Sequence, residues 1–154
     1  HERLVGSEMC IRDSAHTHPF VSVYEAYKKS GPNVLGVEAL QGDDGCTGVK
    51  VNTADGYADY LFSATDMQAH HPSKRVSFCG GLGLIREKEG QIQLMYLGCG
   101  RSLKKGNFVL ESDHDVYAAI YMQHGVWYYS ATGPVRVKIG KETKELNEGY
   151  NQKL

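Results

Sequence analysis

The sequence VYAAIYMQHGVWYYS at residues 116–130 alternates between two kinds of side chain on either side of a short polar turn. Successive side chains of a β-strand point to opposite faces of a sheet, so this alternation is typical of strands. The QHG sequence at 123–125 fits a three-residue hairpin loop with its glycine in the left-handed conformation. We therefore expect an antiparallel hairpin made of strands at 116–122 and 126–130.

The two faces of this hairpin differ in chemistry. A three-residue loop pairs Tyr121 with Trp127 and Ala119 with Tyr129. One face then carries the aromatic side chains of Tyr117, Tyr121, Trp127 and Tyr129. The opposite face carries the aliphatic side chains of Val116, Ala118, Ile120 and Met122, and it is the natural core face. The aromatic face is either a second buried layer, packed on a neighbouring domain, or a platform that stacks on sugar rings.

Similar strand signals extend outward from the hairpin. Runs rich in Val, Ile, Tyr and Phe lie between turns, and 18 of the 154 residues are glycine. The turns TADG (53–56) and EKEG (87–90) place glycine where a positive φ is needed. The other expected strands span residues 20–27, 34–41, 47–53, 58–64, 74–79, 81–88, 91–97, 107–112 and 135–139. This number of strands in one domain predicts an all-β fold, an antiparallel two-sheet β-sandwich.

Alternation within single strands predicts which side chains are buried. In 91–97, Ile92, Leu94 and Tyr96 are expected on one face and Met95 on the other. Such a period of two indicates one buried face and one wet face.

Length and charge predict one sandwich domain at 15–140, followed by a polar, frayed tail at 141–154. The net charge is −1, from 17 Lys and Arg and 18 Asp and Glu. This balance gives no field that would steer the domain onto nucleic acid, so we expect no nucleic-acid partner. The sequence has no long apolar run, and we expect no membrane partner.

The cysteines do not form a metal-binding pattern. Three of the four cysteines, Cys46, Cys79 and Cys99, lie after residue 14, and an odd number allows at most one disulfide among them. Whether any two of them pair is left open. There is no CxxC and no Cys/His pair with zinc-ligand spacing, so no metal or cofactor is expected.

The N-terminal run LVGSEMCIRDS at 4–14 resembles the translation of a transposon mosaic-end adaptor used for sequencing libraries. We therefore expect residues 1–14 to be adaptor-derived or disordered, and the chain to be a fragment of metagenomic origin.

Several spaced motifs resemble the late β-sandwich region of heparinase II/III-like polysaccharide lyases. They are FVSVYEAY (20–27), GVKV (48–51), GYADYLF (56–62), VSFCGGLGLIR (76–86), and LKKG with NFVLE (103–111). The chain departs from the family pattern at Ala26, where the family often has proline, and at the His70-His71 loop.

This resemblance implies a parent protein that cleaves acidic polysaccharide by β-elimination, with an α/α toroid ahead of β-sandwich domains. The family's catalytic residues lie upstream, so no catalytic residue is assigned to this chain. The resemblance implies a non-catalytic C-terminal segment whose partner is the upstream catalytic domain of the same parent chain. Acidic polysaccharide is a further candidate partner. The resemblance also implies a periplasmic or secreted location. Whether the chain itself is an enzyme stays open.

Two histidine pairs are further candidates. His70 and His71, in an expected loop, are candidate carbohydrate-binding residues, and most loop histidines are simply solvated. His16 and His18 have the i, i+2 spacing of metal ligands on a strand, but no third ligand is evident. The alternatives to a lyase segment are thus a stand-alone carbohydrate-binding module and, third, a small enzyme that uses these histidines.

Overall fold

The computed structural model describes residues 5–11, 21–27, 31–40 and 45–154, and these residues are built from β-strands. The strands are β1 (Val5–Ile11), β2 (Val21–Tyr27), β3 (Val34–Leu40), β4 (Cys46–Thr53), β5 (Tyr57–Ala64), β6 (His70–Ser73), β7 (Val76–Lys88), β8 (Gln91–Lys105), β9 (Phe108–Gln123), β10 (Val126–Ala131), β11 (Val135–Ile139), β12 (Glu142–Leu146) and β13 (Gly149–Lys153). The described residues contain no helix long and apolar enough to cross a membrane. His16 and His18 lie outside the described residues.

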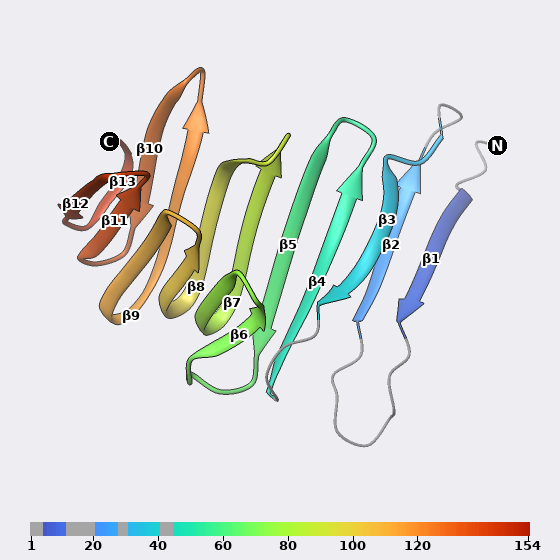
Figure 1. The fold of residues 1–154 in the computed structure, drawn as a ribbon, viewed down its shortest axis with the longest axis horizontal. Helices are drawn as coiled ribbons and strands as arrows, with labels where there is room; N and C mark the ends of the chain where they lie inside the picture. Colours follow the sequence, from blue (N-terminus) through green and yellow to red (C-terminus); the bar gives the residue numbers. More distant parts are fainter. Residues whose placement is uncertain (1–4, 12–20, 28–30, 41–44) are drawn as a thin grey trace.

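One antiparallel sheet contains all the strands from β3 onward (Figure 1). Its main order is β12-β11-β9-β8-β7-β5-β4-β3, with β6 attached to β7, β10 to β9, and β13 to β10. β1 and β2 form a separate antiparallel hairpin beside β3. The Glu25 carboxylate links this hairpin to β3 by accepting hydrogen bonds from the backbone N–H groups of Asn33 (2.7 Å) and Val34 (3.0 Å).

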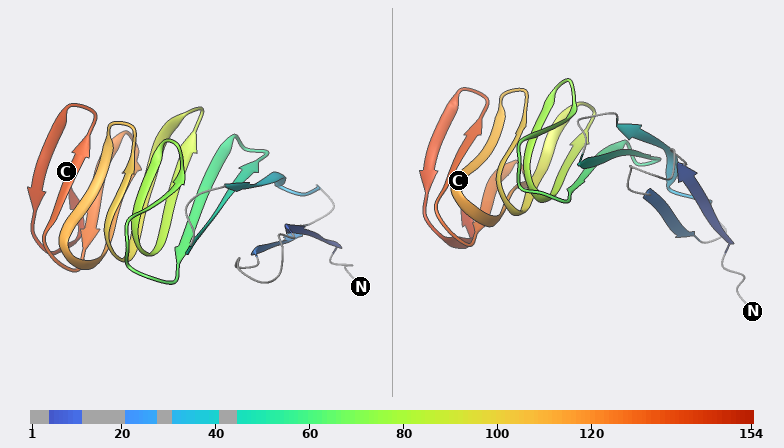
Figure 2. Two further views of the ribbon diagram at one scale, coloured as in Figure 1. Left: turned by 60° about the horizontal axis from the view of Figure 1, so that its bottom comes forward. Right: turned by 90° about the horizontal axis from the view of Figure 1, so that it is seen from below.

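The sheet folds over itself because β7, β8 and β9 are long and bend midway (Figure 2). We call its two halves layer A and layer B. Layer A holds β3, β4, β5, β10, β13 and the halves of β7, β8 and β9 near residues 82–88, 91–98 and 116–123. Layer B holds β6, β11, β12 and the other halves, near 76–79, 101–105 and 108–112. The expected all-β antiparallel sandwich is confirmed, and its two layers are halves of one sheet.

The bends explain why some expected strand boundaries do not exist. The segments 74–79 and 81–88 belong to one strand, β7, and 107–112 and 116–122 belong to β9. The pairing register shifts between Cys79 and Gly80 and again around Gly100, so the strands bend at bulges while the sheet stays continuous. The segment Asp113-His114-Asp115 lies in such a bend and not in a turn between strands.

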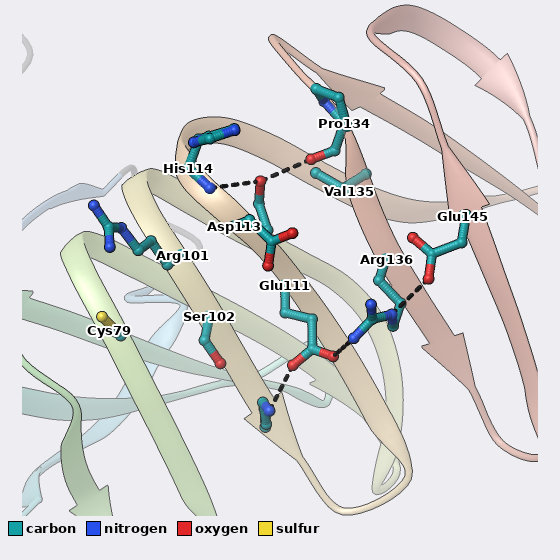
Figure 3. A pocket seen from close by; sticks show the side chains of 12 residues that line it. Cys79, Arg101, Ser102, Glu111, Asp113, His114, Pro134, Val135, Arg136 and Glu145 are labelled. Carbon is teal, nitrogen blue, oxygen red and sulfur yellow. Dashed lines mark hydrogen bonds and ion pairs between the residues drawn. The ribbon is translucent and has the colours of Figure 1, made fainter.

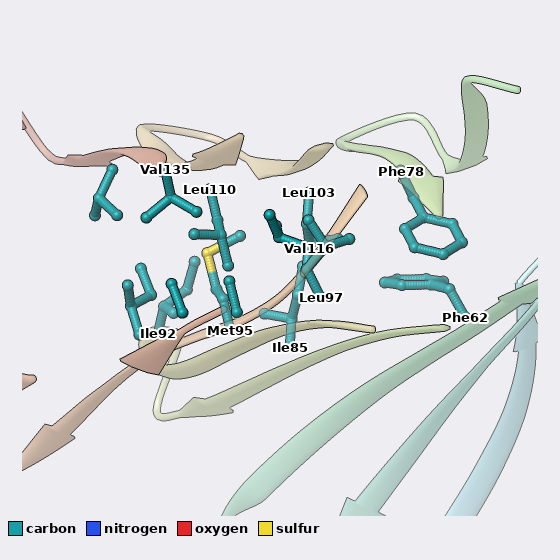
Figure 4. Packing of buried hydrophobic residues seen from close by; sticks show 14 of the residues in the cluster. Phe62, Phe78, Ile85, Ile92, Met95, Leu97, Leu103, Leu110, Val116 and Val135 are labelled. Carbon is teal, nitrogen blue, oxygen red and sulfur yellow. The ribbon is translucent and has the colours of Figure 1, made fainter. Parts of the chain in front are cut away.

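The core lies between the two layers (Figure 4). Leu103, Leu110 and Val135 of layer B face Ile85 and Met95 of layer A, and all five are buried. Towards β5, the rings of Phe62 and Phe78 meet with their centroids 6.0 Å apart. Aliphatic side chains from both layers thus fill one continuous hydrophobic core.

The hairpin of β9 and β10 has a different register from the expected one. Its loop has two residues, His124 (φ 50°) and Gly125 (φ 77°), and Trp127 pairs with Met122 instead of Tyr121. Two successive positive φ angles match a type I′ turn, whose twist suits a two-residue hairpin. The one-residue shift moves Trp127 and Tyr129 to the core face, because side chains alternate with a period of two.

A bulge also corrects the expected faces of β8. Ile92 pairs with Glu87, whereas Leu94 pairs with Arg86, so Gln93 is the extra residue. As a result, Ile92 and Met95 both face the core, and Leu94 and Tyr96 face outward. A bulge adds one residue to the strand. Counting alternate residues straight through it therefore puts the residues beyond the bulge on the wrong face.

The expectation of a frayed tail is wrong. β12 pairs with β11 along its whole length, and β13 pairs with β10. The Leu154 N–H also donates to the Trp127 carbonyl at 2.9 Å. Backbone pairing orders this polar segment, which carries almost no apolar periodicity.

The turn glycines behave as expected, since Gly56 and Gly90 have φ angles of 85° and 77°. β1 lies within the run that resembles an adaptor translation. Its strand conformation does not bear on the origin of this run, which stays a prediction.

Candidate functional site

The outward side of layer A carries a continuous set of apolar and aromatic side chains. We call this set the outer apolar face, and its members are Leu61, Leu82, Leu84, Leu94, Tyr96, Tyr117, Tyr121, Tyr128 and Tyr150. Pairing aligns them in rows across the strands. One row joins Leu61, Leu84 and Tyr96, and another joins Leu94, Tyr121 and Tyr128. Side chains directly opposite each other in a sheet lie on the same face, so the rows form one surface.

Tyrosines line a hollow at the β13 end of this face. Tyr117 is 54% exposed and Tyr150 is 84% exposed, and both line a hollow of about 590 Å³ with Tyr96 and Glu148. Exposed tyrosine rings can stack on a sugar ring, and a carboxylate beside them can accept hydrogen bonds from sugar hydroxyls. This hollow is therefore the candidate site for a saccharide ligand.

Tyr121 and Tyr128 are held in place next to the hollow. Their rings are stacked, with centroids 6.0 Å apart and planes 18° from parallel. The Tyr121 hydroxyl donates to Asn151 Oδ1 at 2.5 Å, and the Asn151 N–H donates to Ser130 Oγ at 2.9 Å. These contacts tie β13 to the hairpin and orient the two rings.

The structure separates the aromatic residues that the sequence grouped together. Tyr117 and Tyr121 lie on the outer apolar face, whereas Trp127 and Tyr129 are half-buried against the core. The Trp127 ring packs on Phe108, with centroids 5.8 Å apart. A single aromatic platform made of Tyr117, Tyr121, Trp127 and Tyr129 does not exist.

The two candidate histidines are also separated. His70 is buried, with 4% of its surface exposed, and its Nε2 lies 2.8 Å from Asp66 Oδ1. It belongs to the short strand β6 and not to a loop. His71 is exposed and points the other way along the strand. His70 is thus an internal residue that a polysaccharide does not reach.

Sequence reasoning missed three tyrosines of the outer apolar face, Tyr96, Tyr128 and Tyr150. The signal for Tyr128 was the His124-Gly125 dipeptide, since two residues that tolerate positive φ favour a two-residue loop. No signal indicated Tyr150, because its position depends on the pairing of β13 with β10.

The outward side of layer B is charged (Figure 3). At the bend, Glu111 accepts from Lys104 Nζ at 2.6 Å and from Arg136 at 3.0 Å, and Arg136 also contacts Glu145 at 2.6 Å. The hydrogen bond from Lys104 lowers the pKa of Glu111, and Arg136 acts in the same direction. These residues line a hollow of about 460 Å³ in which positive and negative groups are paired with each other. The pairing neutralises the hollow, so it is a weak candidate for binding a charged ligand.

A separate charged cluster lies at the edge of the core between the two layers. Lys105 Nζ is 2.5 Å from Glu87 and 3.6 Å from the centroid of the Tyr60 ring. Burial raises the pKa of Tyr60 to about 12, and the charge of Glu87 adds to this effect. Burial also lowers the pKa of Lys105, against the effect of Glu87. The cluster closes this edge of the core.

Cys46, Cys79 and Cys99 form no disulfide with one another. Within the part of the chain that the structure describes, no group of three or more His, Cys, Asp or Glu side chains is arranged to hold a metal ion.

Comparison with known proteins places this geometry in a family. A family model described as "Endo-acting ulvan lyase C-terminal domain" matches residues 34–122. An endo-acting ulvan lyase of Formosa agariphila is 33% identical over 101 residues, which cover 62% of this chain and 12% of that protein. No solved structure matches the chain.

These findings support the resemblance to polysaccharide lyases at the level of a C-terminal domain, and neither match is described as heparinase-like. The chain spans only a small part of the length of its relative. Since the family model covers more than half of the chain, the chain belongs to the family of endo-acting ulvan lyase C-terminal domains.

Proposed function

We propose that this chain is the non-catalytic C-terminal β-sandwich of a polysaccharide lyase, attached to an upstream catalytic domain of the same protein. The observation that carries the proposal is the family match over residues 34–122, which form most of layer A and the bend. The relative is much longer than the matched region, which leaves room for a catalytic domain before it. The charged groups in the two clusters described above are engaged in ion pairs with one another, as in a structural domain.

The substrate of the full-length protein is proposed to be an acidic polysaccharide, cleaved by β-elimination. Ulvan is the first candidate because the relative is an endo-acting ulvan lyase. The heparinase II/III-like affiliation rests on the spaced motifs alone. Since intact polysaccharide chains are too large to enter a cell, we place the protein in the periplasm or outside the cell.

The test is a lyase assay on the full-length protein from the source gene. Ulvan and heparin are incubated separately with the protein, and the unsaturated product of β-elimination is measured by its ultraviolet absorbance. We expect cleavage of ulvan by the full-length protein and no cleavage by a version truncated to its C-terminal domain. Cleavage by the truncated version, or none by the full-length protein on either polysaccharide, would contradict the proposal. Cleavage of heparin in preference to ulvan would support the heparinase-like affiliation.

A second candidate function is a carbohydrate-binding module. The observation that favours it is the hollow lined by the exposed rings of Tyr117 and Tyr150. Tyr117→Ala is then expected to abolish binding in a glycan array. Trp127→Phe, a change inside the core, should leave binding intact. Equal binding by wild type and Tyr117→Ala would exclude this site.

A further inference from the structure

The two outward sides of the sandwich differ sharply in chemistry. On layer B the outward positions near the bend carry Lys104, Glu111 and Arg136, which are partly exposed and engaged in ion pairs. On layer A the corresponding positions carry the leucines and tyrosines of the outer apolar face. The charged groups of this side lie towards its ends: Arg86 pairs with Asp59 at 2.6 Å, Lys153 lies opposite Tyr128, and Glu148 lines the hollow. If the sandwich were isolated, both outward sides would face water and both would be expected to be polar. An apolar patch of this kind marks an interaction site.

The leucine half of the face is unsuited to a saccharide. Leu61 and Leu82 are 38% and 45% exposed. Leu61 pairs with Val49 and Leu84, and Leu82 pairs with Ser63 and Gly98. Sugar recognition requires polar groups placed to bond hydroxyls, and this half offers almost none. A protein surface that buries apolar area matches it better.

Part of the face is already covered by the chain's own N-terminal segment. Val23 and Tyr24 of β2 line an apolar hollow of about 390 Å³ together with Val49, Leu61 and Leu82. Val49 on β4 is only 7% exposed, although it points to the outward side of layer A. β2 therefore covers the β4 end of the face, and Figure 2 shows the hairpin of β1 and β2 turned away from the plane of β3. The chain thus reaches its sandwich from the side of the outer apolar face.

We propose that the outer apolar face is the surface on which the polypeptide preceding this domain packs in the full-length protein. This inference rests on the proposed function, in which a catalytic domain lies upstream. The occupant continues the contact that β2 begins at Val49 and extends it over Leu82 and Tyr117 towards Tyr150. The face is an intramolecular interface, and the hollow beside Tyr117 and Tyr150 is closed by protein.

The test is hydroxyl-radical footprinting of the full-length protein, read by mass spectrometry. For each residue, the oxidation rate of the folded protein is compared with its rate in urea. Leu82, Tyr117 and Tyr150 are expected to be protected roughly fivefold or more, as for side chains in the core of an interface. Leu35, an exposed leucine on β3, and His114, on the charged side, are the reference residues with little protection. Protection of Leu82, Tyr117 and Tyr150 no greater than that of these references overturns the inference.

Two other occupants give different results. Protection that disappears on dilution indicates a second copy of the protein, and protection that appears only when ulvan is added indicates a saccharide. Either result overturns the inference. Lyase activity is measured on the same preparation. Protection without activity preserves the interface and rejects the proposed function, and activity without protection does the reverse.

A matched pair of variants provides a second readout. Leu82→Lys places a charge in the proposed interface, and Leu35→Lys places one on β3 at a leucine that is 68% exposed, against 45% for Leu82. In the full-length protein, Leu82→Lys is expected to speed proteolytic release of the C-terminal domain by roughly tenfold, as buried unpaired charges are poorly tolerated. Leu35→Lys is expected to leave the rate unchanged. Equal release rates for both variants contradict the inference.

Discussion

Gly80 and Gly100 face each other on β7 and β8 where the sheet bends, and a Cβ atom on Gly80 would lie 2.9 Å from the Gly100 Cα. A Cβ on Gly100 would lie 2.6 Å from Leu97 Cδ1 and 2.7 Å from the Cys79 carbonyl oxygen. These separations are well below van der Waals contact. The two backbones can approach this closely only because neither residue has a side chain.

Gly100→Ala is therefore expected to destabilise the domain by about 2–3 kcal/mol, since the methyl group must push apart backbone that carries both layers. Urea unfolding followed by far-ultraviolet circular dichroism measures the change. The control is Gly36→Ala on β3, where a Cβ meets nothing within 4 Å. This control should change stability by no more than about 1 kcal/mol. Equal effects of the two substitutions would show that the bend does not depend on close approach.

Trp127→Ala should destabilise the domain by about 2–3 kcal/mol, because the ring packs on Phe108 and the core. Tyr117→Ala, on the outer apolar face, should change the free energy of unfolding by no more than about 1 kcal/mol. Urea unfolding followed by circular dichroism is suitable for both, as Trp127 is the chain's single tryptophan. A larger loss of stability in Tyr117→Ala than in Trp127→Ala would contradict the two-residue loop and favour the three-residue loop with its aromatic platform.

Tyr60 makes stability depend on alkaline pH. Its pKa is raised from 10.0 to about 12 in the folded chain, so the folded state holds this proton more tightly than the unfolded state does. The resulting stabilisation is complete below pH 10 and is lost as the pH rises from 10 towards 12. Thermal unfolding of wild type and Tyr60→Phe across this range should show that the variant loses less stability. Tyr150→Phe, at an exposed ring, should follow the wild type. Parallel curves for wild type and Tyr60→Phe would contradict the assignment.

His70→Ala is expected to cost about 2 kcal/mol, because it leaves a cavity and removes the partner of Asp66. His71→Ala, at the adjacent exposed position, should cost clearly less. Chemical denaturation measures both. If the two substitutions cost the same, His70 is not the internal residue that the structure describes.

The sequence by itself determined the all-β class, most strand positions and the turn glycines. Period-two alternation and positive-φ glycines are local properties, and they survive in any arrangement of the strands. For the same reason, Val116, Ala118 and Ile120 were correctly predicted to face the core.

Only the tertiary structure decided which faces the other side chains occupy. The two-residue loop at His124-Gly125 and the bulge at Gln93 each shift the alternation by one residue. The first shift moved Trp127 and Tyr129 to the core face and Tyr128 outward, and the second separated Ile92 from Leu94 and Tyr96. A local pattern contains the period of a strand but not its register with the next strand, which depends on turn geometry and on pairing across the sheet.

The candidate site has the same origin. Tyr150 joins Tyr117 because β13 pairs with β10, and His70 is buried because β6 pairs with β7. These pairings connect residues that are distant in sequence, or that lack any apolar pattern of their own. The outer apolar face is thus a product of how the single sheet bends and pairs, while its chemistry, leucine and tyrosine at alternate positions, was present in the sequence from the start.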